Sequence, residues 1–216
     1  MSYSLNEIEA LSKRAARGAG LSWGIAEEAG KAARWLASHD LPGVELLAHV
    51  LVQNDDIALR DLTPTSLEGI WKSPGGTMCP LLAGASLNDC AQRLLTGQAI
   101  EMTGVSHPLI VLPFAAWAAI HIETGVALTW VNVRLETDGF GVWIDGPQDQ
   151  ISTTMPVELT CTRAENRTDP AQPPAQRGIA QVAAWDMLNS FAHRTYAPAT
   201  EESRNLGAGA GTSDND

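Results

Sequence analysis

The amino-acid sequence predicts an α+β fold with an N-terminal helical region, a central antiparallel or mixed sheet, a C-terminal helix and an ordered glycine-rich tail. Apolar residues recur at helical spacing in residues 1–60, whereas they alternate at every second position in the strand-rich part, residues 98–163. Helices and strands are thus segregated along the chain, which favours α+β over alternating βαβ units. At this length either one large domain or two small ones can bury a core, and the division we adopt is a single domain over residues 1–216.

Helices are expected throughout residues 1–60. Ser4 and Glu7 form a capping-box pattern, which satisfies backbone donors at the start of a helix. Ser22 caps a second helix that reaches about Ser38, and its alanine-rich stripe lets a neighbouring helix approach closely. A third helix follows the turn at residues 41–43. Prolines and glycines then predict a loop region over residues 60–80.

The middle of the chain is expected to build the sheet. A short helix begins near Ser86, and Asp138-Gly139 is a hairpin signal between two predicted strands. The apolar kernel at residues 108–120 is too short to span a membrane and predicts a buried strand that runs through Pro113 into a buried helix. The predicted strands lie at residues 99–105, 126–136, 141–144 and 156–162.

The C-terminal part divides by composition into three segments. Residues 164–177 are proline-rich and polar, so they are expected to form an exposed loop. Residues 178–194 carry a helical pattern that begins at about Ile179. Residues 195–216 are the glycine-rich tail, which composition alone would call disordered but which carries a varied set of polar side chains.

Charge and cysteine content limit the classes of partner. The chain has 14 Lys+Arg and 25 Asp+Glu, a net charge of −11, and an acidic surface repels nucleic acid and anionic membranes. Cys79, Cys90 and Cys161 show neither CxxC nor zinc-ligand spacing, which favours a reducing cytoplasm and predicts no metal centre from these residues. The partners we expect are a small polar molecule and either a second copy of the chain or a partner enzyme.

Two end motifs carry a family resemblance. The run SLNEIEALSKRAARGAGLSWGIAEEAGKA near the N-terminus and the ending TYAPATEESR…GAGAGTSDND resemble an uncharacterised bacterial family of single-domain proteins, a domain of unknown function. The resemblance implies a bacterial source and a domain that spans the chain. It also implies that the tail is a working part, and it supplies no activity and no catalytic residue.

A second, weaker similarity concerns the same N-terminal segment. Its helix–loop–helix rhythm is similar to the N-terminal region of malate/L-lactate dehydrogenase-like NAD enzymes. The Ser-His-Gly that such enzymes place after this helix pair is replaced by Gly43-Val44-Glu45, and this chain is much shorter. A dehydrogenase is therefore not predicted.

One face of the second helix is a candidate site. Glu27 and Lys31 are spaced to form an ion pair one turn apart, and Trp23 and Arg34 lie on the same side. A carboxylate held by a lysine can act as a general base, so Glu27 and Lys31 are candidate catalytic residues, with Trp23 and Arg34 as ligand-binding residues. The alternative is a solvated charged face with no function.

Cys79 and His107 are further catalytic candidates. A cysteine nucleophile needs a thiolate, which a nearby histidine favours, and His107 or His121 could supply the base. The alternative for Cys79 is a buried structural cysteine, and for His107 an imidazole that hydrogen-bonds backbone carbonyls.

The tail offers a third set of candidates. Ser203 and Arg204, together with the backbone at Gly207 and Gly209, could bind an anion, although the spacing matches no nucleotide-binding loop. Its carboxylates could instead hold a divalent cation through hard oxygen ligands. No other cofactor is indicated, and the alternative is a tail without function.

These observations favour a cytoplasmic protein that binds or converts a small polar metabolite, an acid or an amide, in catabolism. Whether the chain is an enzyme is left open by the sequence. The alternative is a non-catalytic accessory subunit whose alanine-rich helices and tryptophans pack against a partner enzyme.

Overall fold

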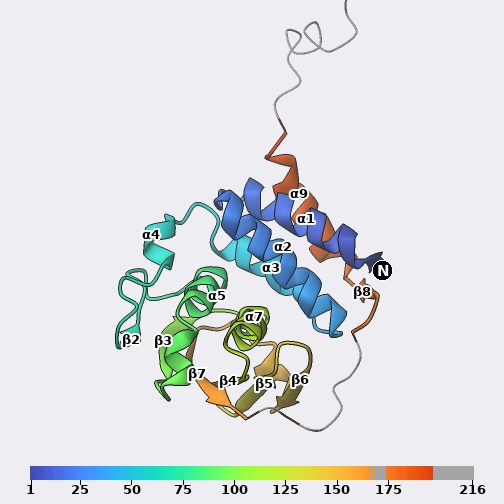
Figure 1. Cartoon of the computed structure of the whole chain (residues 1–216). Coiled ribbons are helices and arrows are strands. Elements are labelled where there is room, and N and C mark those ends of the chain that lie inside the picture. The colour runs from blue at the N-terminus through green and yellow to red at the C-terminus, as the bar shows by residue number, and fades with distance from the viewer. Residues whose placement is uncertain (166, 168–173, 197–216) are drawn as a thin grey trace, which may run out of the picture.

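The structure, a computed structural model, describes residues 1–165, 167 and 174–196, and these residues form three layers (Figure 1). A helical layer lies at the top of Figure 1, a pair of helices fills the middle, and a sheet forms the bottom. The helical layer consists of α1 (Leu5–Gly18), α2 (Trp23–Ser38), α3 (Gly43–Gln53) and α9 (Val182–His193), and the middle layer of α5 (Pro80–Asp89) and α7 (Leu112–Ile122). The α+β class predicted from the sequence is confirmed.

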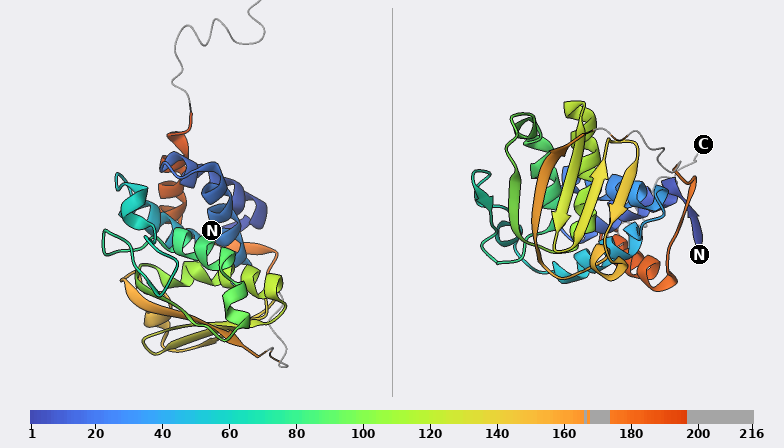
Figure 2. Two further views of the ribbon diagram at one scale, coloured as in Figure 1. Left: turned by 60° about the vertical axis from the view of Figure 1, so that its left-hand side comes forward. Right: turned by 90° about the horizontal axis from the view of Figure 1, so that it is seen from below.

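The described part of the sheet has the strand order β2-β3-β7-β4-β5-β6 and is mixed. Strand β2 pairs parallel with β3, whereas the other neighbours pair antiparallel. Helices cover one face, and the view from below in Figure 2 shows the other face open. The strands are β2 (Ile70–Trp71), β3 (Ile100–Val105), β4 (Gly125–Trp130), β5 (Val133–Thr137), β6 (Val142–Asp145) and β7 (Val157–Ala164).

A separate pair of short strands joins the two ends of the described chain. Strand β1 (Ser2–Ser4) pairs antiparallel with β8 (Arg177–Ile179), and the Met1 ammonium donates to the Ala180 carbonyl at 2.7 Å. The sequence predicted neither strand, because three residues are too few to show a period. Ile179 therefore lies in a strand, and the final helix begins later than predicted, at Val182. The remaining short elements are α4 (Leu59–Leu62), α6 (Gln92–Leu95), η1 (Pro108–Val111) and α8 (Gln148–Ile151).

The helix starts predicted in the N-terminal region are confirmed. The Glu7 backbone N–H donates to Ser4 Oγ at 3.2 Å, and the Ser4 N–H donates to Glu7 Oε2 at 2.7 Å, which completes the capping box. Ser22 caps α2 by accepting from the Ile25 N–H. Helices α1 and α2 approach closely, since a Cβ at Gly30 would lie 2.8 Å from the Glu9 carbonyl oxygen.

The predicted strand over residues 126–136 is wrong, because the chain turns in its middle. Strand β4 ends at Trp130 and β5 begins at Val133, which pairs directly with Trp130. Val131 has a left-handed φ of 45° and is 75% exposed. The large core side chains lie at even positions in β4 (Val126, Leu128, Trp130) and at odd positions in β5 (Val133, Leu135). A β-branched valine within the turn is typical of a strand, so the sequence pattern does not reveal this change of face. The hairpin predicted at Asp138-Gly139 is confirmed between β5 and β6.

The apolar kernel over residues 108–120 contains no strand, contrary to prediction. It forms the 3-10 turn η1 and then α7, with Pro113 in the first turn of the helix, where a missing N–H costs nothing. Helix α5 begins at Pro80 rather than near Ser86, because a proline is tolerated in the first turn of this helix too. The loop predicted over residues 60–80 contains α4 and β2.

Some sequence predictions fall outside the described residues. The glycine-rich tail, predicted to be ordered, lies there from residue 197 onward, and so does part of the proline-rich loop. Among the helices of the described ranges, none combines the length and apolar character needed to cross a membrane.

Candidate functional site

The charged face predicted on α2 exists, but its ion pairs differ from the prediction. Glu27 accepts from Lys13 of α1 at 2.6 Å, and Lys31 instead donates to Glu28 at 3.0 Å. The predicted pair of Glu27 with Lys31 is therefore wrong, because α1 lies close enough to place Lys13 beside the carboxylate. Arg34 likewise reaches across to Glu9 of α1 at 2.7 Å.

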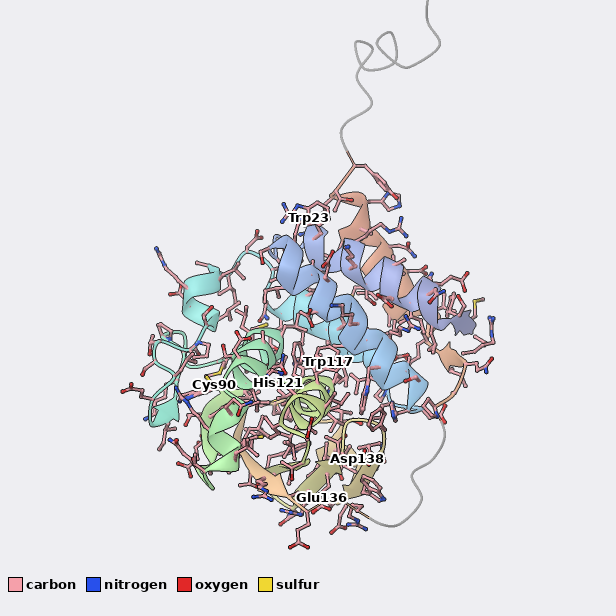
Figure 3. The ribbon with its side chains drawn as sticks, viewed as in Figure 1. Trp23, Cys90, Trp117, His121, Glu136 and Asp138 are labelled. Carbon is pink, nitrogen blue, oxygen red and sulfur yellow. The ribbon has the colours of Figure 1, made fainter. Side chains whose placement is uncertain are left out.

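The electrostatics of this face follow from those contacts. The hydrogen bond from Lys13 lowers the pKa of Glu27, and the hydrogen bond to Glu28 raises the pKa of Lys31. Trp23 is 64% exposed at the end of the helical layer (Figure 3), with the Arg17 guanidinium 5.0 Å from its ring centre. The charged groups stabilise one another in water, so the face has the character of a solvated helix pair.

A cavity of about 460 Å³ lies where the ends of several helices meet. In the described part of the chain, it is bounded by the C-terminal ends of α1, α3 and α9 and by the N-terminal ends of α4 and α5. Its volume lies within the usual range for small-molecule sites, roughly 300–1,000 Å³. The lining residues are Gly18, Ala19, Gly20, Leu21, Val50, Leu51, Asn54, Asp55, Asp56, Ile57, Ala58, Leu59, Cys79, Leu81 and Arg194.

Cys79 lies in the cavity wall as the residue before α5. The residue is only 1% exposed, and this burial raises the pKa of the thiol. The backbone of Leu82 and Leu81 and the side chain of Asn54 act in the opposite direction without overcoming burial. The thiol is therefore protonated at neutral pH and is a weak nucleophile in this state.

Three consecutive polar residues after α3 give the cavity its polar groups. Asn54 Oδ1 is buried without a hydrogen-bond partner among the described residues. Asp55 accepts two hydrogen bonds from the Arg194 guanidinium, at 2.7 and 2.8 Å, which lower the pKa of Asp55 and raise that of Arg194. Asp56 follows with a left-handed φ of 60°.

His107 is buried at a different place, at the start of η1. It is 1% exposed, has a left-handed φ of 47°, and neither ring nitrogen has a partner in the described ranges. Burial, aided by the nearby His49, lowers its pKa to about 4. The histidine is neutral at physiological pH. No hydrogen bond within the described residues joins it to Cys79, so a cysteine–histidine dyad is not assembled here.

The structure places the sets of candidate residues in different regions. Cys79 lines the cavity, whereas Trp23, Glu27, Lys31 and Arg34 do not. His121, the other candidate base, is exposed on α7 (Figure 3).

The tail candidates Ser203, Arg204, Gly207 and Gly209, and the carboxylates proposed for a divalent cation, lie outside the described residues. Among the residues that are described, no group of three or more His, Cys, Asp or Glu side chains could hold a metal ion.

The residues that sequence reasoning missed are Asn54, Asp55, Asp56 and Arg194. A run of three polar residues directly after an apolar helix is a usable signal, because such a run often faces a site at the helix end. Arg194 gives no comparable signal, since it meets Asp55 only through the packing of α9 beside α1 and α3.

Comparisons with known proteins match the N-terminal third of the chain to a family model and supply no activity. Residues 3–79 match the family model DUF3726, described as a protein of unknown function, which confirms the resemblance to a domain of unknown function. This match covers α1 to α4 and β2, and ends at Cys79. A search of curated proteins found no match.

One solved structure is similar over part of its length. Malate dehydrogenase from Entamoeba histolytica aligns with 79% of this chain and 50% of its own, at 11% identity and a TM-score of 0.45. The chain thus spans about half the length of that enzyme, and a likeness at this level assigns neither fold nor activity.

Proposed function

We propose that this chain binds a small polar molecule, an acid or an amide, in the cavity between α1, α3, α5 and α9. The observation that carries the proposal is a cavity of ligand size with the buried, unpartnered Asn54 Oδ1 in its wall. A buried polar atom without a partner costs roughly 1–3 kcal/mol, so a ligand or water that reaches it recovers part of that cost. We also propose that the protein is cytoplasmic, as its cysteine content predicts.

The cavity can position a ligand with both polar and apolar parts. Leu21, Leu51 and Ile57 offer apolar surface, while Asn54 and the Asp55–Arg194 pair offer hydrogen-bonding groups. This combination of an apolar lining and a few converging polar groups is typical of small-molecule sites.

The charged face on α2 is a weaker place for the ligand. Glu27, Lys31 and Arg34 already hold charged partners, so a ligand there must compete with existing ion pairs in water. The catalytic roles proposed for Glu27, Lys31, Cys79 and His107 remain predictions. Cys79 is the one of these that borders the cavity, and in its protonated form it donates a weak hydrogen bond rather than attacking a ligand.

A cavity-blocking variant tests the proposal. Ala58 lines the cavity and is exposed, so Ala58→Trp should fill it with little cost in stability. Screening with carboxylic acids and amides should find ligands that raise the unfolding temperature and move the NMR resonances of the full chain. The same ligands should leave both quantities unchanged in this variant. Ala183→Trp, at an exposed position of α9 outside the cavity, is the matched control and should keep the response.

Two results would contradict the proposal. Ligands that bind the Ala58→Trp variant as tightly as the parent chain would place the site elsewhere. Loss of the response in Glu27→Gln together with its survival in Ala58→Trp would return the site to the α2 face.

A second candidate function, the accessory subunit, is supported by large apolar side chains at the surface. Phe140, Ile179 and Met155 are among the exposed ones, and an interface would bury them. A partner could be an enzyme or a second copy of the chain. The absence of any ligand response, together with co-purification of a defined second chain that protects Phe140 from hydrogen exchange, would favour this candidate.

A further inference from the structure

The electrostatics of the cavity favour one class of ligand, and this inference rests on the proposed function. Within the described residues, three helices present their C-terminal ends to the cavity: α1 through Gly18 and Ala19, α3 through Asn54, and α9 through Arg194. Each of these helices has at least 11 residues. A helix C-terminus carries a partial charge of about −0.5, concentrated on carbonyls of the last turn.

The N-terminal ends of α5 and α4 oppose this potential only in part. The end of α5 lies at Cys79 and contributes a partial charge of about +0.5. The end of α4 lies at Ala58 and Leu59, and because α4 has only four residues it adds less than that. The formal charges lining the cavity act in the same direction, since Asp55 and Asp56 carry two negative charges and Arg194 one positive charge. Arg194 is moreover committed to Asp55 through both of its terminal nitrogens.

The unpartnered oxygen of the Asn54 amide adds a requirement for a donor. Asn54 Oδ1 is an acceptor, and so are the carbonyls of the helix ends and the carboxylate of Asp56. A ligand that carries N–H groups can donate to these acceptors, whereas a carboxylate brings only further acceptors and a like charge.

We propose that the cavity selects a small molecule with a cationic or N–H-rich head and an apolar body, namely a primary ammonium first and a primary amide second, and that it disfavours carboxylates. The head lies toward Asn54 and Asp56, and the body packs on Leu21, Leu51 and Ile57. Of the two ligand classes named above, the amide is therefore retained and the acid is disfavoured.

A matched probe series tests the selection. n-Butylammonium, butyramide and butyrate have similar apolar bodies and differ in the head group. In NMR titrations of the full chain at low salt, we expect the dissociation constant to rise in that order, with shifts at the amides of residues 54–56. Higher salt should weaken binding of the ammonium and leave binding of the amide unchanged.

Asp56→Asn removes one charge from the cavity at little structural cost. Asparagine tolerates the left-handed φ of 60° at this position. We expect the variant to bind n-butylammonium about two- to fivefold more weakly, the range for an exposed charge pair, and to bind butyramide unchanged. The matched control is Asp40→Asn, which makes the same change at a left-handed φ of 56° after α2, outside the cavity, and should leave all three titrations unchanged.

The outcomes separate the two proposals. Tightest binding of butyrate, or equal binding of all three probes at the cavity, would overturn the selection and leave the binding function standing. An Asp56→Asn variant that binds n-butylammonium as the parent chain does would also overturn it. Absence of binding by every probe, with no response in the wider screen, would remove the proposed function as well.

Discussion

The α1–α2 face and the helix-end cavity are both rich in polar groups, yet these groups are satisfied in one region and incompletely satisfied in the other. On the face, Lys13, Lys31 and Arg34 each hold a carboxylate within 3.0 Å in contact with water. At the cavity, Asn54 Oδ1 is buried with no partner in the described part of the chain. A polar group that already has a partner contributes little to the free energy of ligand binding, whereas a buried group without a partner favours binding. Partner satisfaction therefore separates the regions better than polarity does.

The largest expected effect concerns a second unsatisfied interior group among the described residues, His107. Its pKa is about 4 in the folded chain and about 6.5 when unfolded, so below pH 6.5 the unfolded state binds the additional proton. The free energy of unfolding should fall by roughly 3 kcal/mol as the pH drops from 6.5 to 4, with the full stabilisation present above pH 6.5. Urea unfolding across this range measures the slope.

His107→Asn keeps the left-handed backbone accessible and removes the titration. The unfolding free energy of this variant should change less between pH 6.5 and 4.5 than that of the parent chain. The control is His121→Asn, which removes an exposed imidazole. Equal slopes in the parent chain and His107→Asn would show that the buried imidazole does not titrate as stated.

The next effect tests how rigidly the cavity wall is packed. A Cβ at Gly18 would lie 1.8 Å from the Phe191 carbonyl oxygen of α9, so Gly18→Ala must push α1 and α9 apart. We expect a loss of about 1–3 kcal/mol, as for other overpacked sites. A Cβ added at Gly24 on α2 meets nothing within 4 Å, so Gly24→Ala should raise the free energy of unfolding by about 0.5–1 kcal/mol. Chemical denaturation of both variants checks the difference in sign.

A smaller effect distinguishes satisfied from unsatisfied amides. Asn54→Leu removes a buried oxygen that has no partner together with the weak side-chain hydrogen bond to Cys79, so the unfolding free energy should stay nearly constant while cavity ligands are lost. In Asn189→Leu the same change removes a hydrogen bond to the Trp185 carbonyl, and a loss of about 0.5–1.5 kcal/mol is expected. Equal losses at both sites would show that Asn54 is satisfied in solution.

The smallest effect is expected on the charged face. Lys13→Met and Arg34→Met break exposed ion pairs, so neither should measurably change the unfolding midpoint or the binding of a cavity ligand. Thermal unfolding at low and high salt, with ligand titrations on both variants, checks this. A marked loss of ligand binding in either variant would make the face part of the site and remove the contrast with the cavity.

Local patterns accounted for much of the fold. The capping box at Ser4 and Glu7, the Ser22 cap and the hairpin at Asp138-Gly139 were all predictable, because each depends on contacts between residues a few positions apart. The errors lie where local signals compete. Pro113 was expected inside a strand-to-helix transition, yet a proline also suits the first turn of a helix.

The candidate site was much less predictable. Cys79 was singled out and does line the cavity, but as a protonated thiol rather than an assembled nucleophile. Glu27 was correctly expected to form an ion pair and was given the wrong partner, since spacing on α2 carries no information about Lys13 on α1. Arg194 and Asp55 are 139 positions apart, and no pattern in the chain links them.

Sequence patterns were enough to predict the helical N-terminal region, the segregation of helices from strands and the acidic balance of the whole chain, because each of these follows from composition or from spacing within one element. The positions at which polar groups are left without partners depend instead on how the elements pack. The packing of α9 against α1 and α3 brings three helix C-termini of the described chain to one cavity. Burial and long-range contacts decide whether a polar side chain is satisfied, and both are properties of the packed molecule.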